Sequence, residues 1–287
     1  MKRSKELRKI ILVAIFSALC CACTFIQIKM PTGDFVHLGN FVMIISALLL
    51  GGIEGGLVGS IGMGLYDLLF YINKPSTIIR TIILKFIIGF TVGFLFRLII
   101  KKDIKIKPLF ISLASVFGVF FVCSLVLFIL GDKSSFGAEN NYSAVFANIF
   151  GSTSKLSISI LIPIFTALFF ALIIFALIFS KKLSTRSKAV LFAVNVALII
   201  NIIGEFLLRW FLEGIMVSNF DVSIIVATSK IPGSVITAFV SIFLTVLIYD
   251  PIYKSLSATG YIESFEENNK TETSKLATDA EVSVKTE

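Results

Sequence analysis

Long runs of apolar residues, separated by short polar stretches, fill the chain from near its start to about residue 254. A membrane-spanning helix needs about 20 mostly apolar residues, and most of these runs approach or exceed that length. The pattern predicts about eight transmembrane helices, of which the second and third form a hairpin that turns at the sequence GGIEGG. They cover residues 10–28, 37–51, 53–71, 77–100, 108–130, 156–180, 188–213 and 226–249. The predicted fold class is therefore an all-α, polytopic integral membrane protein.

The chain changes character after Asp250 and Pro251. Residues 255–287 are rich in Ser, Thr, Glu and Lys and contain hardly any aromatic residues. Such a composition buries too little apolar surface to offset the entropy of ordering. We therefore predict a transmembrane domain over residues 1–254 and a disordered cytoplasmic tail over residues 255–287. A polar loop at 131–155 retains several aromatic residues and is a candidate to fold over the outer face of the membrane.

Composition and charge agree with a membrane location. The chain is 56% hydrophobic and only 15% charged, whereas soluble domains carry about 25% charged residues. The net charge of +8 does not indicate nucleic acid, because the basic residues gather in short segments between apolar runs. They concentrate in the first nine residues and around residues 101–107 and 181–188. Basic residues favour the cytoplasmic side, so both termini are predicted to be cytoplasmic, which agrees with an even number of spans.

The N-terminus has a second interpretation. Its basic flank and apolar core resemble a secretory signal peptide. Leu19 stands where a small residue would precede a lipidated Cys20, and seven further apolar runs follow, so we favour an uncleaved first helix. The four cysteines all lie in apolar runs without other metal-ligating residues nearby, which favours buried, inert thiols and no metal site.

Small residues recur at helical spacing in two regions. Gly52, Gly56, Ser60 and Gly64 recur every fourth residue, and the fourth predicted helix carries Gly89 and Gly93. Small side chains let two helix backbones approach closely, so these glycines are predicted to pack helices inside the protein. In the first helix, Ala14, Ala18 and Ala22 form a similar stripe. This alanine stripe has no obvious partner within the chain and is the better candidate to face another protein.

Polar and ionisable residues within the apolar runs lie at a similar depth, toward the outer side. Such groups are costly in a membrane and usually face a cavity or a partner. The candidate ligand-binding residues are His37, Asn40, Tyr66, Asp67, Arg80, Lys85, Asn201, Glu205, Trp210 and Lys230. A structural alternative is that Asp67 neutralises Arg80 and that Glu205 neutralises Arg209. Lys85 and Lys230 have no carboxylate at helical spacing and are the stronger candidates to contact a ligand.

Motifs that would indicate an enzyme are missing from the sequence. No G-x-x-x-x-G-K-[ST], H-E-x-x-H or G-x-S-x-G pattern occurs, so the chain is not predicted to hydrolyse nucleotides or act as a protease or acyl hydrolase. The two halves also lack the matching broken helices of inverted-repeat transporters. No cofactor is expected.

The stretch PTGDFVHLGNFVMIISALLLGGIEGGLVGSIGMGLYDLLF, followed by TIILKFIIGFTVGFLF, resembles the substrate-binding S component of energy-coupling factor (ECF) transporters, particularly the riboflavin-transporter-like group. Near the end, SKIPGSVITAFVSIFLTVLIYDPIYK resembles the last helix of that group. Ala14 and Ala18 resemble its A-x-x-x-A docking motif. The resemblance covers residues 8–100 well and 188–254 loosely. Members usually have six helices, so an extra pair at about 107–180 departs from the pattern.

The resemblance implies a subunit in a bacterial cell membrane that captures a vitamin or related molecule from outside. Its implied partners are a membrane coupling protein, two ATP-binding subunits, the ligand and the lipid bilayer. Riboflavin, a pyrimidine precursor and another vitamin all remain open as ligands. The alternative is a self-sufficient secondary transporter that uses Asp67 or Glu205 as a proton or cation site, and an intramembrane enzyme is a third, less favoured reading.

Overall fold

The computed structural model describes residues 2–29, 35–130, 183–218 and 230–259, together with scattered positions between 166 and 178 and between 223 and 227. The first half contains α1 (Lys2–Phe25), β1 (Gln27–Lys29), β2 (Phe35–His37), α2 (Gly39–Leu50), α3 (Gly52–Phe70), α4 (Pro75–Lys101) and α5 (Ile106–Leu130). The second half contains α8 (Thr185–Val217) and α10 (Ile231–Ala258).

These elements confirm the predicted class. Five of the described helices, α1, α3, α4, α8 and α10, are long and apolar enough to cross a membrane, and α2 is a shorter apolar helix. The described residues include seven helices, so the predicted count of eight is not confirmed. A feature that hydropathy did not predict is the short antiparallel hairpin of β1 and β2, in which Ile28 pairs with Val36.

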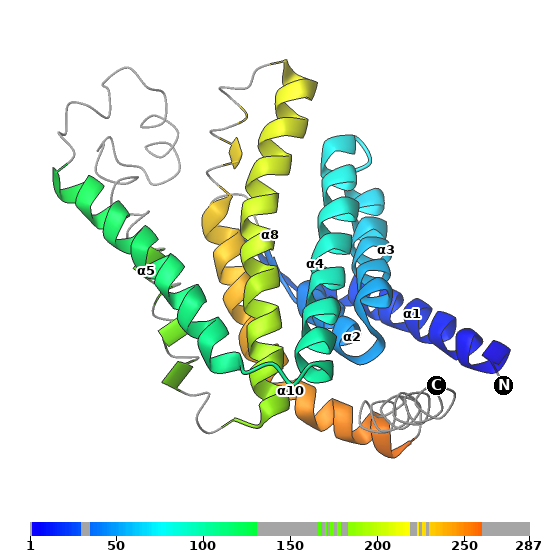
Figure 1. The fold of residues 1–287 in the computed structure, drawn as a ribbon. Helices are drawn as coiled ribbons and strands as arrows, with labels where there is room; N and C mark the ends of the chain where they lie inside the picture. Colours follow the sequence, from blue (N-terminus) through cyan, green and yellow to red (C-terminus); the bar gives the residue numbers. More distant parts are fainter. Residues whose placement is uncertain are drawn as a thin grey trace, which may run out of the picture.

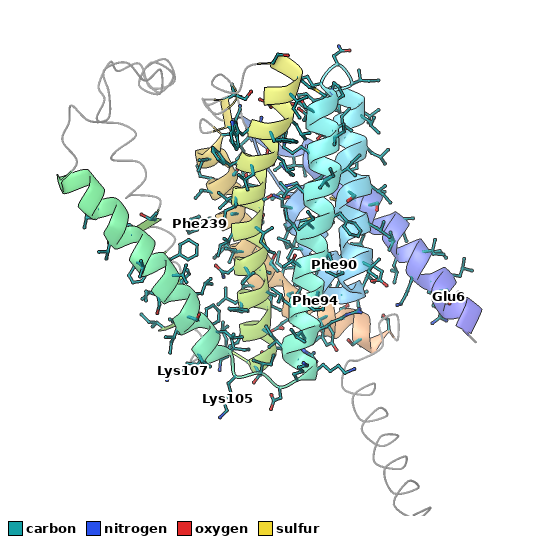
Figure 2. All side chains as sticks on the ribbon, turned by 45° about the horizontal axis from the view of Figure 1, so that its top comes forward. Glu6, Phe90, Phe94, Lys105, Lys107 and Phe239 are labelled. Carbon is teal, nitrogen blue, oxygen red and sulfur yellow. The ribbon has the colours of Figure 1, made fainter. Side chains whose placement is uncertain are left out.

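The helices form a bundle in which α4 lies between α3 and α8, as Figure 1 shows. Helix α10 packs against α8 and α2, while α1 packs against α2 and α3 and then diverges from the bundle at its N-terminal end. Helix α5 leans away from α8 along most of its length (Figures 1 and 2). Many apolar side chains on the outside of the bundle are exposed, among them Phe90, Phe94 and Phe243. This arrangement suits a protein whose surrounding solvent is lipid.

The turn between α2 and α3 is tighter than predicted. Helix α2 ends at Leu50 and α3 begins at Gly52, so Gly51 alone makes the turn, and most of GGIEGG forms the start of α3. Gly51 has a φ of 128°, which side chains other than glycine rarely adopt. The Arg97 guanidinium donates a hydrogen bond to the Leu50 carbonyl and so satisfies one of the free acceptors at the end of α2.

Glycines form the contact between α3 and α4. A Cβ atom at Gly89 would lie 2.5 Å from the backbone of Gly55, and one at Gly93 would lie 2.4 Å from the backbone nitrogen of Gly52. The two backbones therefore meet almost directly. This confirms the prediction that the glycines serve packing inside the protein.

The C-terminal helix runs further than predicted. Helix α10 continues through Pro251 to Ala258, nine residues past the predicted end at 249 and into the segment assigned to the tail. Pro251 lacks an N–H and leaves one carbonyl of the preceding turn without its helical partner, yet the helix persists. The rest of the predicted tail, the loop at 131–155 and most of the predicted helix at 156–180 lie outside the described residues.

Candidate ligand-binding site

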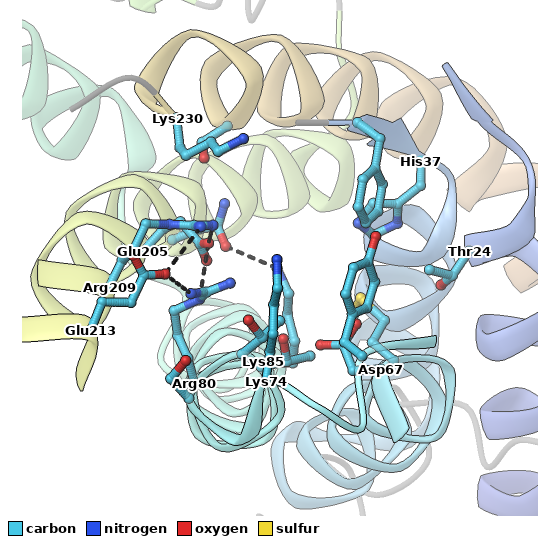
Figure 3. Close-up of a pocket in the computed structure, with 18 of the residues that line it drawn as sticks. Thr24, His37, Asp67, Lys74, Arg80, Lys85, Glu205, Arg209, Glu213 and Lys230 are labelled. Carbon is cyan, nitrogen blue, oxygen red and sulfur yellow. Dashed lines mark hydrogen bonds and ion pairs between the residues drawn. The ribbon is translucent and has the colours of Figure 1, made fainter. Parts of the chain in front are cut away.

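A cavity of about 520 Å³ opens at the end of the bundle where α4 and α10 begin and where α3 and α8 end. This volume lies within the range of roughly 300–1,000 Å³ that is typical of small-molecule sites. Its walls come from α2, α3, α4, α8, α10, the strand β2 and the end of α1 at Thr24 (Figure 3). Eight charged residues line it: Asp67, Lys74, Arg80, Lys85, Glu205, Arg209, Glu213 and Lys230.

Most of the residues proposed from the sequence meet in this cavity. The lining includes His37, Asn40, Asp67, Arg80, Lys85, Asn201, Glu205 and Lys230. Tyr66 and Trp210 are not part of it. The Tyr66 hydroxyl donates a hydrogen bond to Gln27 Oε1 at 3.3 Å, and its ring packs against Phe25. Trp210 directly follows the lining residue Arg209 on α8. Because consecutive residues are rotated by about 100° around a helix, its side chain leaves α8 in a different direction from that of Arg209.

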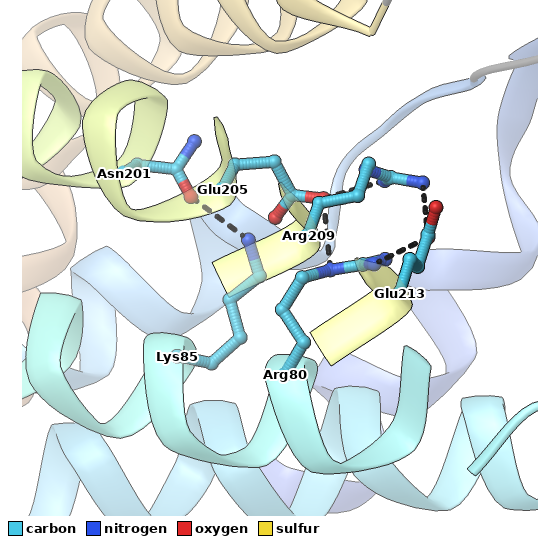
Figure 4. Close-up of polar contacts among 6 residues, drawn as sticks. All are labelled: Arg80, Lys85, Asn201, Glu205, Arg209 and Glu213. Atoms are coloured by element: carbon cyan, nitrogen blue, oxygen red, sulfur yellow. Dashed lines mark hydrogen bonds and ion pairs between the residues drawn. The ribbon is translucent and has the colours of Figure 1, made fainter. Parts of the chain in front are cut away.

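A network of four charged side chains joins α4 to α8 beside the cavity (Figure 4). Arg80 Nε lies 3.1 Å from Glu205 Oε1, and Arg80 Nη1 lies 3.5 Å from Glu213 Oε1. Arg209 contacts the same two carboxylates from its own helix, at 2.7 Å and 3.5 Å. The Arg80 side chain is only 5% exposed. Each arginine therefore contacts both glutamates, and the network as a whole is neutral.

These contacts settle the two ion pairs considered from the sequence. The pairing of Glu205 with Arg209 is confirmed. Within the described residues Asp67 and Arg80 form no direct ion pair, because Arg80 contacts Glu205 and Glu213 on α8 instead. Glu213, which the sequence reasoning omitted, follows Arg209 at the same four-residue spacing and could have been found by extending that series.

Lys85 makes a different kind of contact. Its ammonium donates a hydrogen bond to Asn201 Oδ1 at 3.1 Å, and both side chains are buried. Among the described residues, no carboxylate forms an ion pair with it. Lys85 was expected to lack a carboxylate partner within its own helix. In the described part of the chain it also has no ion pair with a carboxylate of another helix.

His37 and Asn40 belong to the segment that leads into α2. The Gly39 N–H donates a hydrogen bond to His37 Nδ1 at 3.1 Å, which fixes this nitrogen as the acceptor. Burial and, after it, the positive charge of Lys85 lower the pKa of His37 from 6.5 to about 3, although the negative charge of Glu205 opposes the shift. His37 is therefore a neutral imidazole at physiological pH.

We expect acid to destabilise the protein through His37. Below pH 6.5 His37 binds a proton in the unfolded chain, whereas in the folded chain it does so only near pH 3. The folded state is therefore destabilised progressively as the pH falls between these values. The expected loss is about 2 kcal/mol at pH 5. Melting temperatures of the purified protein in detergent, compared at pH 7 and pH 5, should fall further for the wild type than for a His37→Gln variant. An equal fall in both proteins would contradict this role.

Two buried acceptors in the cavity wall have no hydrogen-bond partner within the described part of the chain. They are Asn40 Oδ1 and Asp67 Oδ2, and their residues are 2% and 5% exposed. Both residues line the cavity. A buried acceptor without a donor costs free energy, so these two oxygens are a cost to the folded state.

The bundle and its cavity define the class: an all-α, multi-pass membrane protein with a polar cavity that opens at one end of the bundle. Comparison with protein families adds the specific assignment, because the family model described as "ECF-type riboflavin transporter, S component" matches residues 4–165. The match covers more than half of the chain, so the chain belongs to this family, and it is a substrate-binding component of an ECF transporter. That family is a class of transport proteins, not of enzymes. No curated protein and no solved structure matches the chain.

Proposed function

We propose that the chain captures a vitamin-like small molecule in this cavity and delivers it across the membrane as part of an ATP-driven importer. The observation that carries the proposal is the cavity itself, where polar groups from α2, α3, α4, α8 and β2 meet inside an otherwise apolar bundle. Polar groups in such a setting are costly unless they bind something. We assign substrate binding to the eight predicted residues that line it, and leave Tyr66 and Trp210 out.

The distribution of basic residues supports a cavity that opens to the outside. Helix α4 begins beside the cavity at Pro75 and ends at Lys101, about 40 Å away at 1.5 Å per residue. The basic segment of Lys101, Lys102, Lys105 and Lys107 follows that far end, and Figure 2 places Lys105 and Lys107 at the foot of α5. Basic loops favour the cytoplasm, so we propose a bacterial cell membrane location with both termini cytoplasmic.

The exposed face of α1 supports the proposal that other subunits supply the energy for transport. The sequence carries no nucleotide-binding motif, so ATP hydrolysis has to come from other subunits. Ala14, Ala18 and Ala22 are exposed on α1, whereas Ser17 and Cys20 on its other face are buried. A row of small side chains lets another helix approach closely. We propose that this face docks a membrane coupling protein that carries two ATP-binding subunits.

Reconstitution tests both parts of the proposal. Proteoliposomes that contain the chain, a coupling protein and ATP-binding subunits should take up ligand only when ATP is present. A double variant, Ala14→Leu with Ala18→Leu, should lose co-purification with the coupling protein and retain ligand binding, because the alanine face lies away from the cavity. The matched control is Leu19→Ala, which changes an exposed residue on a neighbouring face of α1. Uptake by the chain alone under an ion gradient would contradict the proposal and favour a secondary transporter.

A further inference from the structure

We propose that His37 is a fixed hydrogen-bond donor to the ligand through its Nε2–H group. The ligand therefore presents an acceptor at that point, such as a carbonyl oxygen or an unprotonated ring nitrogen. This inference rests on the proposed capture function and names the chemistry of one contact within that site. It follows from how the backbone holds the His37 ring and from which of its two nitrogens the cavity reaches.

The strand β2 presents His37 to the cavity. Successive side chains of a strand point to opposite sides. The half-buried Phe35 and His37 both line the cavity, whereas Val36 between them is 8% exposed and does not. The pairing of His37 with Gln27 on β1 holds this register, and Figure 3 shows His37 at the cavity wall. The hairpin thus determines which side of β2 a ligand meets.

The backbone determines which ring nitrogen of His37 carries the hydrogen. The Gly39 N–H donates to Nδ1 at 3.1 Å, so Nδ1 is an acceptor and carries no hydrogen. A neutral imidazole then carries its single hydrogen on Nε2. Glycine at position 39 permits this approach, because a Cβ atom there would lie only 2.9 Å from Nδ1. The chain itself therefore sets the tautomer before a ligand arrives.

Burial and the charge of Lys85 keep the ring neutral. Protonation would place a hydrogen on Nδ1, directed at the Gly39 N–H, and would add a positive charge to a cavity that already holds the Lys85 ammonium. Burial and this neighbouring charge lower the pKa of His37 to about 3, although Glu205 opposes the shift. At physiological pH, Nε2 therefore donates a hydrogen bond and does not accept one.

The Nε2 atom of His37 is open to the cavity, unlike the acceptors near it. Asn40 Oδ1 and Asp67 Oδ2 are fully buried, so a ligand in the cavity does not touch them. His37 Nε2 also has no hydrogen-bond partner among the described residues, but it is not one of the fully buried atoms. A ligand atom can therefore reach it. A ligand donor placed there would leave two hydrogens facing each other unpaired, so this contact selects for an acceptor.

The tautomer can be measured directly, because His37 is the only histidine in the sequence. The full chain would be labelled with ¹⁵N-histidine and purified in detergent, and its imidazole nitrogens observed by NMR at neutral pH. The spectrum should show a hydrogen on Nε2 and none on Nδ1. A hydrogen on Nδ1, alone or together with one on Nε2, would overturn the inference.

The same sample tests the contact with a ligand. Riboflavin, thiamine, pantothenate and uridine would each be added, and the melting temperature recorded beside the spectrum. With the compound that raises the melting temperature most, the Nε2 nitrogen and its hydrogen should both shift downfield, as a hydrogen bond to an acceptor requires. An unchanged Nε2 signal would refute the contact and leave the capture function intact. Stabilisation by none of the compounds would contradict the capture function, and the contact with it.

Two substitutions of His37 separate ligand binding from structure. An Asn side chain can accept from the Gly39 N–H near the position of Nδ1 but is too short to replace Nε2–H, whereas Gln places an amide N–H near Nε2. His37→Asn should weaken binding of the stabilising compound about tenfold, the effect of one lost hydrogen bond in a buried site. His37→Gln should retain most of the affinity.

The melting temperature of the empty protein completes this comparison. The empty His37→Asn protein should melt close to the wild type, because the acceptor for Gly39 remains. Lys102→Met removes an exposed lysine just past the far end of α4 and should change neither stability nor affinity. Wild-type affinity in His37→Asn, or an equal loss in both His37 variants, would make His37 a structural residue and rule out the donor role.

Discussion

Replacing Arg80 with Met is expected to destabilise the folded protein by about 3–5 kcal/mol, the usual cost of removing one partner from a buried ion pair. Among the residues that the structure describes, Arg80 is the only one from α4 in the network. Its side chain is 5% exposed. Without it, Glu205 and Glu213 share Arg209 alone, and one negative charge is left unbalanced next to apolar helices. The measurement is thermal unfolding of the purified variant in detergent.

A double variant distinguishes lost charge balance from lost packing. Arg80→Met combined with Glu205→Gln restores neutrality and should recover part of the stability, as a double-mutant cycle would show. Arg8→Met, at an exposed position of α1, is the control and should leave the melting temperature unchanged. No loss in Arg80→Met, or no recovery in the double variant, would show that the network does not hold α4 to α8.

The second large effect is expected at the contact between α3 and α4. Gly89→Ala should destabilise the protein by about 1–3 kcal/mol, the usual cost of overpacking. The added Cβ would lie 2.5 Å from the backbone of Gly55, which cannot move aside as a flexible side chain can. This loss should appear even though alanine favours a helix over glycine by about 1 kcal/mol. Thermal unfolding and the yield of monodisperse protein are the measurements.

Gly64→Ala is the matched control for that change. Its Cβ would lie 3.0 Å from Cγ1 of Ile82, an atom of a side chain that has other rotamers. The variant should therefore be neutral or slightly stabilised. If Gly89→Ala proved as stable as Gly64→Ala, the close approach of α3 and α4 would not be a constraint on the fold.

Many residues of the cavity were predictable because a charged side chain within an apolar run is costly wherever it contacts lipid. A lysine or arginine in the middle of a span has to face a cavity or a partner, and depth along each helix brings most of the candidates to one level. The sequence alone does not give the direction of each side chain. Trp210 shows this limit: it lies at the right depth, next to Arg209, yet on a part of α8 that does not line the cavity.

Contacts between distant segments were the part that sequence could not supply. Asn201 lies 116 positions from Lys85 and Glu213 lies 133 positions from Arg80, and helical spacing relates only residues within one helix. The same reason explains why the glycines of α3 were assigned to packing without a known partner. Hydropathy also overlooked β1 and β2, because strands of three residues are too short to show an alternating pattern.

The network of Arg80, Glu205, Arg209 and Glu213 also restricts how the two halves of the chain could change independently. Arg80 belongs to the N-terminal half, which the family model matches, and the other three lie beyond residue 165. A chimera that joined residues 4–165 to helices without acids at the positions of Glu205 and Glu213 would keep Arg80 and lose both of its carboxylates. Replacing Arg80 alone would leave Glu205 and Glu213 to share Arg209, with one negative charge unbalanced. The four charges of the network balance only when both halves contribute, so exchanging one half without its share of the network would leave an unbalanced charge inside the bundle.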